Sequence, residues 1–318
     1  MNVVAAIRAG LAAPRDGGDL ATWLALNKFC AEAAMLLALL PPGDDVVACA
    51  RAVRAASDTE RTYRWLLQVP DLCVSAPGET QLLLDRVAPE PSRCGDLARE
   101  LLAAGWGSAT ERTPSQVLEH AWTRRLAGLA TPDEPLALRQ SAVASRVSPV
   151  FALRQEAYGF THAVAFATDF GTRPLPPWVS RADLAASVAG LLLWQVGAAD
   201  ADLLAETLAT AEMLGLGSSP EARLGWATLA SLAPGLPFAV PGTVPAAQYH
   251  PALATAIAYA VRRSPVPGPA PGEDAAVRDA VEAVRLCRRG DWAAAARYDV
   301  PLLRADLLRY PGRALVDR

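Results

Sequence analysis

Apolar residues recur three and four positions apart along most of the chain, which is the spacing that gives an α-helix one apolar face. Runs in which Val, Ile or Thr alternate with polar residues are nearly absent, so strands are not expected. Residues that favour a helix start precede three of the clearest patterns: Asp19 before 20–40, Ser57 or Asp58 before a helix ending at Gln68, and Thr113 with Pro114 before 115–129. The pattern predicts an all-α protein of roughly fourteen to sixteen helices.

The connections between these predicted helices are short, so consecutive helices should pack as antiparallel hairpins. Two arrangements suit such a series: an α/α toroid-like barrel whose inner helices surround a central pit, or an open α-solenoid with a concave face. Residues 184–196 and 203–214 are apolar over most of the helix circumference and rich in alanine. Small residues allow the close approach that inner helices need, which favours the toroid.

Two stretches rich in proline and glycine, 234–245 and 264–272, interrupt the helical pattern near the C-terminus. The second separates an arginine-rich segment from the rest of the chain. We therefore predict a main helical domain over 1–263, a linker over 264–272 and a C-terminal helical cap over 273–318.

One predicted helix, within residues 153–171, carries a line of polar groups along an otherwise apolar sequence. Gln155, Tyr158, His162 and Asp169 fall within roughly 60° of one another on a helical wheel. Ala165 beside this line would leave room next to the imidazole. This stripe is the strongest candidate for a site in the sequence.

The stripe suggests acid–base chemistry, since a neutral imidazole accepts a proton near pH 7 and its conjugate acid returns it. His162 is therefore the predicted acid–base. Tyr158, one turn earlier, could donate to a developing oxyanion, with Thr161 orienting the substrate. Asp169 lies about 10 Å further along the axis, so it would hold a second polar group of the same substrate. The structural alternative is a bonded core histidine, a packing tyrosine and an aspartate in a helix C-terminal turn.

Further substrate-binding candidates lie on and near this stripe. Gln155 starts it, and Arg173 follows it, where the guanidinium could anchor an anionic group or pair with Asp169. Trp194 and Gln195 stand in an apolar helix, where a tryptophan can line a pocket and a glutamine needs a polar partner. Packing between helices is the alternative use of the tryptophan.

Charge and composition exclude several classes of partner. The formal net charge of −3 is spread along the chain, which argues against nucleic-acid binding. The longest apolar runs, near 29–40 and 184–199, contain or adjoin charged residues and are shorter than the about 20 residues of a membrane span. We therefore expect no membrane contact and a cytoplasmic location, while a homodimer stays open.

Metal and cofactor motifs are absent from the sequence. The five cysteines are scattered without a Cys-x-x-Cys pair, and no glycine-rich nucleotide loop or His-Glu-x-x-His helix occurs. We predict no cofactor and no metal. A metal held by His162 and Asp169 together with distant ligands is left open.

The stripe also carries a resemblance to a known family. Tyr158, Thr161 and His162, followed by Thr168-Asp169-Phe170-Gly171, resemble the Tyr-x-x-Thr-His and Thr-Asp-Phe-Gly pattern of an uncharacterised actinobacterial family that is often linked to specialised-metabolite gene clusters. The resemblance covers about residues 150–180. It implies an all-helical fold and a shared role for Tyr158, Thr161, His162 and Asp169.

Together these features predict an enzyme of specialised metabolism. It would bind a largely apolar small molecule or peptide intermediate in a central helical pit and carry out cofactor-independent cyclisation, isomerisation or elimination, as a lyase, isomerase or cyclase. The alternative is a non-catalytic helical scaffold or carrier that binds a partner protein. The alternative predicts a packed stripe and an exposed apolar patch elsewhere.

Overall fold

The computed structural model describes residues 3–11, 20–107, 111–236, 246–262 and 273–304. In these ranges the chain forms fifteen α-helices and three 3-10 helices, and it contains no β-strand. The predicted all-α fold is confirmed. The choice between a toroid and an open solenoid stays a prediction.

Local sequence signals set the helix starts. The hydroxyl of Thr113 accepts from the backbone N–H of Gln116 at 3.4 Å and the Gln116 side chain accepts from the Thr113 N–H at 2.9 Å, so a capping box opens the helix with Pro114 at its first position. One predicted start, at Ser57 or Asp58, is wrong by one or two residues. Ser57 ends the preceding helix, where its hydroxyl donates to Val53 at 2.8 Å, and Thr59 caps the next helix instead.

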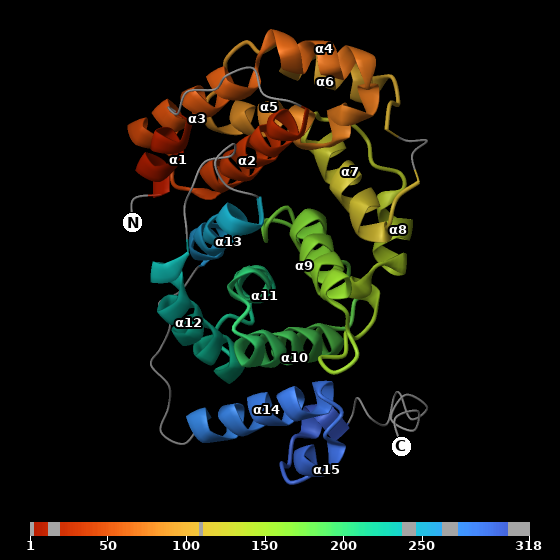
Figure 1. Cartoon of the computed structure of the whole chain (residues 1–318). Helices are drawn as coiled ribbons and strands as arrows, with labels where there is room; N and C mark the ends of the chain where they lie inside the picture. The colour runs from red at the N-terminus through yellow and green to blue at the C-terminus, as the bar shows by residue number, and fades with distance from the viewer. Residues whose placement is uncertain (1–2, 12–19, 108–110, 237–245, 263–272, 305–318) are drawn as a thin grey trace. The chain divides into compact units, whose positions relative to one another are not determined.

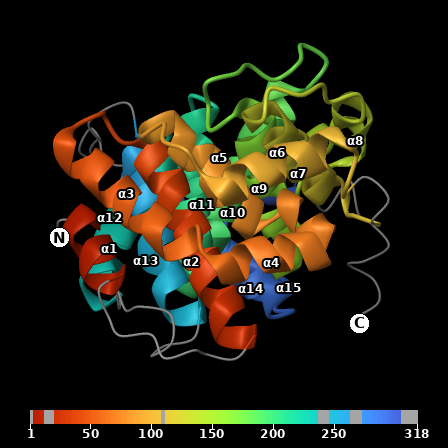
Figure 2. The same ribbon diagram turned by 90° about the horizontal axis from the view of Figure 1, so that it is seen from above.

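The chain folds into two compact units, of which the first comprises Met1–Ala137 and Leu236–Ala260. Within it α2 packs along α5 (Figure 1), and Figure 2 shows α3 beside α2. Tyr249 of α13 is fully buried and its ring meets Phe29 of α2 edge-on at 5.4 Å. The helices of this unit are α1 Val3–Leu11, α2 Leu20–Leu39, α3 Asp44–Ser57, α4 Glu60–Gln68, η1 Pro70–Val74, α5 Ala76–Val87, α6 Arg93–Ala103, α7 Pro114–Leu126 and α13 Ala246–Val261, and α8 Glu134–Gln140 crosses its boundary.

Helix α2 is the one described helix that is long and apolar enough to cross a membrane by length and composition. Buried core helices and N-terminal signal sequences have the same properties. In this structure half of the apolar stretch of α2 is buried, and α2 packs against α3 and α5.

The second unit comprises Leu138–Gly235 and Val261–Arg318. Helix α11 lies between α9 and α12, and α10 packs against α11, α12 and α14 (Figure 1). Gly225 allows α12 to approach α11 closely, since a Cβ at this position would lie 3.1 Å from Leu208 Cδ2 of α11. The helices of this unit are η2 Ala142–Ala144, α9 Arg154–Thr168, α10 Arg181–Ala198, α11 Ala201–Met213, α12 Pro220–Leu232, η3 Ala233–Gly235, α14 Glu273–Arg288 and α15 Trp292–Ala295.

The predicted linker 264–272 lies outside the described residues. The described part of the predicted cap, 273–304, packs on α10 and α12 and shares their core through Val277, Val284 and Leu303. The predicted boundaries of the main domain, 1–263, and of the cap, 273–318, stay a prediction.

Candidate functional site

Helix α9 presents its polar groups along one edge. The helix begins at Arg154. Leu153 is the N-cap residue, and its N–H donates to the Glu156 carboxylate at 2.7 Å. Ala157, Phe160 and Val164 are fully buried on its core side. Arg154, Tyr158 and His162 follow one another at four-residue intervals, so they lie one turn apart on the same edge.

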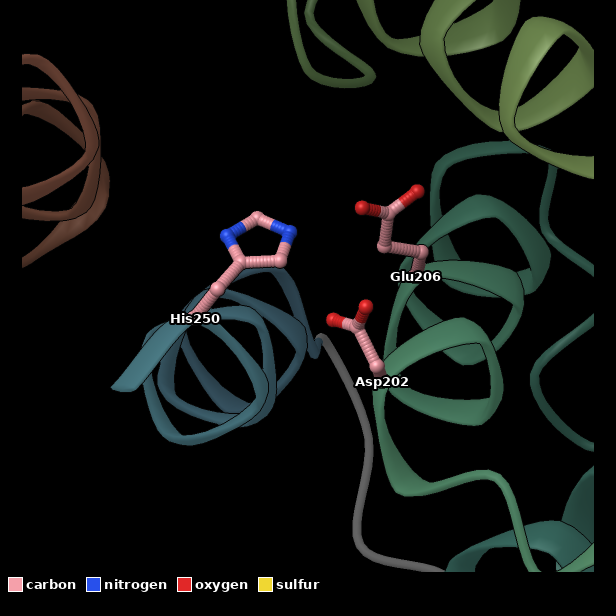
Figure 3. Close-up of side chains that lie close together, drawn as sticks. All are labelled: Asp202, Glu206 and His250. Carbon is pink, nitrogen blue, oxygen red and sulfur yellow. The ribbon is translucent and has the colours of Figure 1, made fainter. Parts of the chain in front are cut away.

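Helix α11 supplies carboxylates to the same region of the second unit. Asp200 caps the helix by accepting from the Leu203 N–H at 3.3 Å. Asp202 and Glu206, one turn apart, project from one side of α11 (Figure 3), and their side chains are only 10% and 12% exposed. His250, also drawn in Figure 3, extends from α13 of the first unit, where its Nδ1 lies 3.0 Å from Glu32 Oε1.

The first half of the cluster joins Arg154 and Tyr158 to the start of α11. The Tyr158 hydroxyl donates to Asp202 Oδ2 and accepts from Arg154 Nη2 at 2.9 Å. Arg154 also pairs with Asp200, and its Nη2 lies 3.3 Å from Asp202 Oδ2. Burial, together with the hydrogen bond to Asp202, raises the pKa of Tyr158 well above its usual range. The phenol therefore stays protonated and its proton is directed at Asp202.

The second half of the cluster is centred on Glu206. The Thr161 hydroxyl donates to Glu206 Oε2 at 2.6 Å, and His162 Nε2 lies 3.5 Å from the same oxygen. The His162 ring also contacts the rings of Tyr158 and Phe166, with centroids 5.9 and 5.8 Å away. Its side chain remains 48% exposed. The imidazole is thus supported by a mostly buried carboxylate while half of its surface stays accessible.

This arrangement is chemically suited to proton transfer. A carboxylate beside an imidazole stabilises the imidazolium form and orients the ring. His162 could therefore take a proton from a substrate, with the charge stabilised by Glu206. The sequence placed Asp169 as the second acid of the site, whereas the contacts around His162 and Tyr158 come from Glu206 and Asp202 of α11.

Asp169 has a clear backbone role at the end of α9. It adopts a left-handed conformation at φ 46°, followed by Phe170 at φ 53° and Gly171 at φ 83°. Its carbonyl oxygen accepts from the N–H and hydroxyl of Thr172 at 3.2 and 2.9 Å. This is the helix C-terminal turn of the structural alternative, and the predicted catalytic role of Asp169 stays a prediction.

The predicted binding residues lie in different surroundings. Gln155 is exposed in the first turn of α9, and Arg173 is exposed after its last turn. Trp194 faces α14, where the Arg288 guanidinium lies 3.6 Å from its ring centroid. Gln195 is fully buried in α10, and neither of its amide atoms has a hydrogen-bond partner among the described residues. A buried amide needs a hydrogen-bond partner, and the described residues provide none for Gln195.

Arg154, the N-cap Asp200 and the α11 acids Asp202 and Glu206 were not predicted from the sequence as site residues. The four-residue spacing of Asp202 and Glu206 puts them on one helix face, which is a signal that the sequence contains. Their pairing with α9 spans 44 and 45 residues of sequence, and no local pattern reveals it.

Carboxylates such as Asp202 and Glu206 are also ligands that divalent cations prefer. Within the second unit they accept hydrogen bonds from Tyr158 and Thr161, and Asp202 lies beside the Arg154 guanidinium. These contacts fix the positions of both carboxyl groups. The prediction that the chain binds no metal stays a prediction.

Comparison with known proteins identifies a family but no activity. A family model described as a domain of unknown function (DUF6895) matches residues 2–260. No curated protein and no solved structure matches the chain. The matched range includes α9 and α11 and ends before α14.

Proposed function

We propose that this chain, which belongs to the DUF6895 family, is an enzyme that carries out acid–base chemistry at the α9–α11 cluster. The observation that supports the proposal is the pair formed by His162 and Glu206, with Nε2 and Oε2 3.5 Å apart. The carboxylate is mostly buried and the imidazole is half exposed, so a substrate can reach the imidazole while the carboxylate supports it from the protein side.

Each residue of the cluster has a role in this proposal. His162 transfers the proton and Glu206 stabilises its charged form, while Thr161 fixes the Glu206 carboxylate. Tyr158 and Arg154 hold Asp202 on the neighbouring turn of α11. The predicted oxyanion role of Tyr158 requires that its hydroxyl turn away from Asp202 when a substrate binds.

The reaction class follows from the same groups. An imidazole that removes a proton and returns it can catalyse a cyclisation, an isomerisation or an elimination, and none of these reactions needs a cofactor. The resemblance of Tyr158, Thr161, His162 and Asp169 to the actinobacterial pattern supports a place in specialised metabolism. We propose a largely apolar small molecule or peptide intermediate as the substrate, a cytoplasmic location, and no nucleic-acid or membrane partner. A toroid with a central pit remains the proposed arrangement for binding this substrate.

The test is an untargeted search for the reaction. Native protein and His162→Asn are each incubated with a metabolite extract from the organism that encodes the chain, and mass spectrometry follows metabolites that are consumed or formed. The proposal expects a change with native protein that slows by about 10²-fold or more in the variant. Ser231→Ala, an exposed change on α12, is the control and should act as native.

Equal conversion by His162→Asn would contradict the assignment of His162. A native protein that changes no metabolite, in extracts prepared under several growth conditions, would contradict the enzymatic proposal as a whole. Thermal unfolding of each variant must match the native curve, so that a lost activity is not a lost fold.

A second candidate function, a scaffold or carrier, is favoured by one observation in the first unit. Leu20 and Leu24 of α2 are each 45% exposed, and Leu67 and Val69 at the end of α4 are 52% and 40% exposed. The stacked rings of Trp23 and Trp65, 5.5 Å apart, join these two segments. Exposed apolar residues on adjoining segments are typical of protein-binding surfaces.

This second function has its own test. A carrier should co-purify with a partner chain, and Leu24→Glu combined with Leu67→Glu should abolish the association while leaving any metabolite conversion intact. If no partner is retained by native protein, the scaffold candidate fails. If a partner is retained and no metabolite changes, it replaces the enzymatic proposal.

A further inference from the structure

The segment after residue 260 lies outside the family match, yet it forms part of the core of the second unit. Val284 of α14 is fully buried there, together with Leu193 of α10 and Val150 of the loop before α9. A terminal segment that is only attached to a surface would not share buried residues with two other elements. The described part of this segment, 273–304, is therefore integral to the unit that holds the candidate site.

The most specific link is made by Arg288, the last residue of α14. Its Nη1 donates to the carbonyl oxygens of Pro149, Val150 and Ala152 at 2.8, 3.1 and 3.1 Å. The guanidinium also lies against the face of Trp194, 3.6 Å from the ring centroid. One guanidinium thus donates hydrogen bonds to three carbonyl groups, each of which would otherwise need its own donor.

These three carbonyls belong to the loop that leads directly into α9. Ala152 is two residues before Arg154, the first residue of the helix. The other side of the loop is held by α10, where the Ser187 hydroxyl accepts from the Val147 N–H at 2.9 Å. At Gly190 a Cβ would lie 2.9 Å from Pro149, so α10 approaches the loop as closely as a glycine permits. The loop is therefore fixed between α10 and α14.

Two more contacts join the C-terminal segment to the same loop. Arg146 Nη2 donates to the Leu302 carbonyl at 3.0 Å, and the rings of Phe151 and Trp292 lie 6.0 Å apart. Residues beyond the family match thus contact this loop at Arg146, at Phe151 and at the three carbonyl groups bound by Arg288.

We propose that Arg288 is a positioning residue, through which the C-terminal segment sets the start of α9 and thereby the placement of Arg154 and Tyr158 against the acids of α11. The inference rests on the proposed function only in treating this cluster as the active site. Trp194, predicted from sequence to bind substrate, acts in this view as the surface on which Arg288 rests. The C-terminal segment then supports the site from outside the range that the family match covers.

The test compares two variants of the full chain on α14. Arg288→Met keeps an extended apolar side chain and removes the donors, whereas Val284→Ala weakens the same core and leaves the three hydrogen bonds from Arg288 to the loop in place. Amide hydrogen exchange is measured over the first turns of α9, and NMR follows the pH titration of the His162 ring. The protein has only three histidines, so their signals can be assigned by substitution.

The expected result is specific to Arg288→Met. Exchange at the hydrogen-bonded amides of residues 156–160 should rise by about tenfold relative to α12, and the midpoint of the His162 titration should move, while Val284→Ala changes neither despite its lower melting temperature. Arg288→Lys, whose ammonium can donate to the same carbonyls, should restore much of the protection.

Equal local exchange in Arg288→Met and Val284→Ala, or an unchanged α9 in Arg288→Met, would reduce Arg288 to a core contact and overturn the proposal. If Arg288→Met does not fold, the comparison of Arg288→Lys with Arg288→Gln supplies the same contrast. None of these readouts needs a substrate, so the inference can hold or fail independently of whether His162 proves to be catalytic.

Discussion

Each unit contains a cluster that joins an arginine to carboxylates, and the two clusters differ in how much water reaches the arginine. In the first unit Arg54 of α3 donates to Gln81 at 3.4 Å, to Asp85 at 2.9 Å and to the Ala88 carbonyl at 2.9 Å. Its side chain is 7% exposed. In the second unit Arg154 is 50% exposed and His162 is 48% exposed, while the acids behind them are mostly buried.

This difference in exposure distinguishes a structural network in the first unit from a candidate site in the second. A buried guanidinium whose partners are all internal fixes α3 against α5, and no substrate can reach it. Half-exposed basic groups supported by buried carboxylates can meet a substrate without rearranging the core. Similar residue types therefore serve stability in one unit and are available for chemistry in the other.

The largest expected effect is on stability and concerns the two arginines. Arg54→Met should lower the free energy of unfolding by about 3 kcal/mol, because it leaves the Gln81 and Asp85 side chains short of a buried partner. Arg154→Met should cost about 1 kcal/mol or less, since the pairs of a half-exposed arginine are screened by water. Urea denaturation measures both. Equal losses would mean that the two clusters do not differ as described.

The second prediction concerns Glu79, a buried acid of the first unit. Burial, with the nearby Glu119 charge, raises the pKa of Glu79 well above its usual range, although the Thr123 hydroxyl lies 2.9 Å from its Oε1. The folded state therefore holds this proton more tightly than the unfolded state does. The resulting stability is fully present below the ordinary carboxyl pKa and is lost as pH rises toward the folded value.

Glu79→Gln should remove this dependence. Melting temperatures taken from pH 4 to pH 8 should fall more steeply for native protein than for the variant. Parallel curves would show that Glu79 is ionised or that its burial is relieved in solution.

The third prediction compares two fully buried glutamines, one in each unit. Gln81 bonds Arg54, Ser57 and Ser92, whereas both amide atoms of Gln195 lack a partner among the described residues. Gln81→Met should therefore destabilise the protein, and Gln195→Met should stabilise it by about 1–2 kcal/mol. A loss of stability in Gln195→Met would mean that its amide is bonded in solution. Calorimetry of the two variants distinguishes these outcomes.

The sequence predicted those features that depend on neighbouring residues. Residues within one or two helical turns of each other determine the Thr113–Gln116 capping pair and the apolar face around Phe160. The helices and the polar line of α9 could therefore be predicted. Helical spacing placed His162 in the polar line, and the acid–base chemistry of its imidazole made it the first candidate. The burial of Gln195 followed from its place inside an apolar run.

What could not be foreseen depends on which helices pack together. Asp169 shares the helical edge of His162, but the chain turns into a left-handed conformation there, and the acids near the imidazole come from α11 instead. The same holds for Arg288, whose carbonyl partners lie 136 to 139 residues earlier. Tertiary packing determines such pairs, and a helical wheel describes only residues of one helix.

The most direct test of the central claim, that Glu206 supports the His162 imidazole, is the pH titration of the three histidine rings by NMR in native protein and in Glu206→Gln. His120 provides an internal control, because burial, together with Arg112 and Arg124, lowers its pKa to about 4. The account predicts that the His162 midpoint falls by about one pH unit in the variant while the His120 signals are unchanged. A His162 midpoint that is the same in both proteins would contradict the pairing on which the proposed chemistry depends.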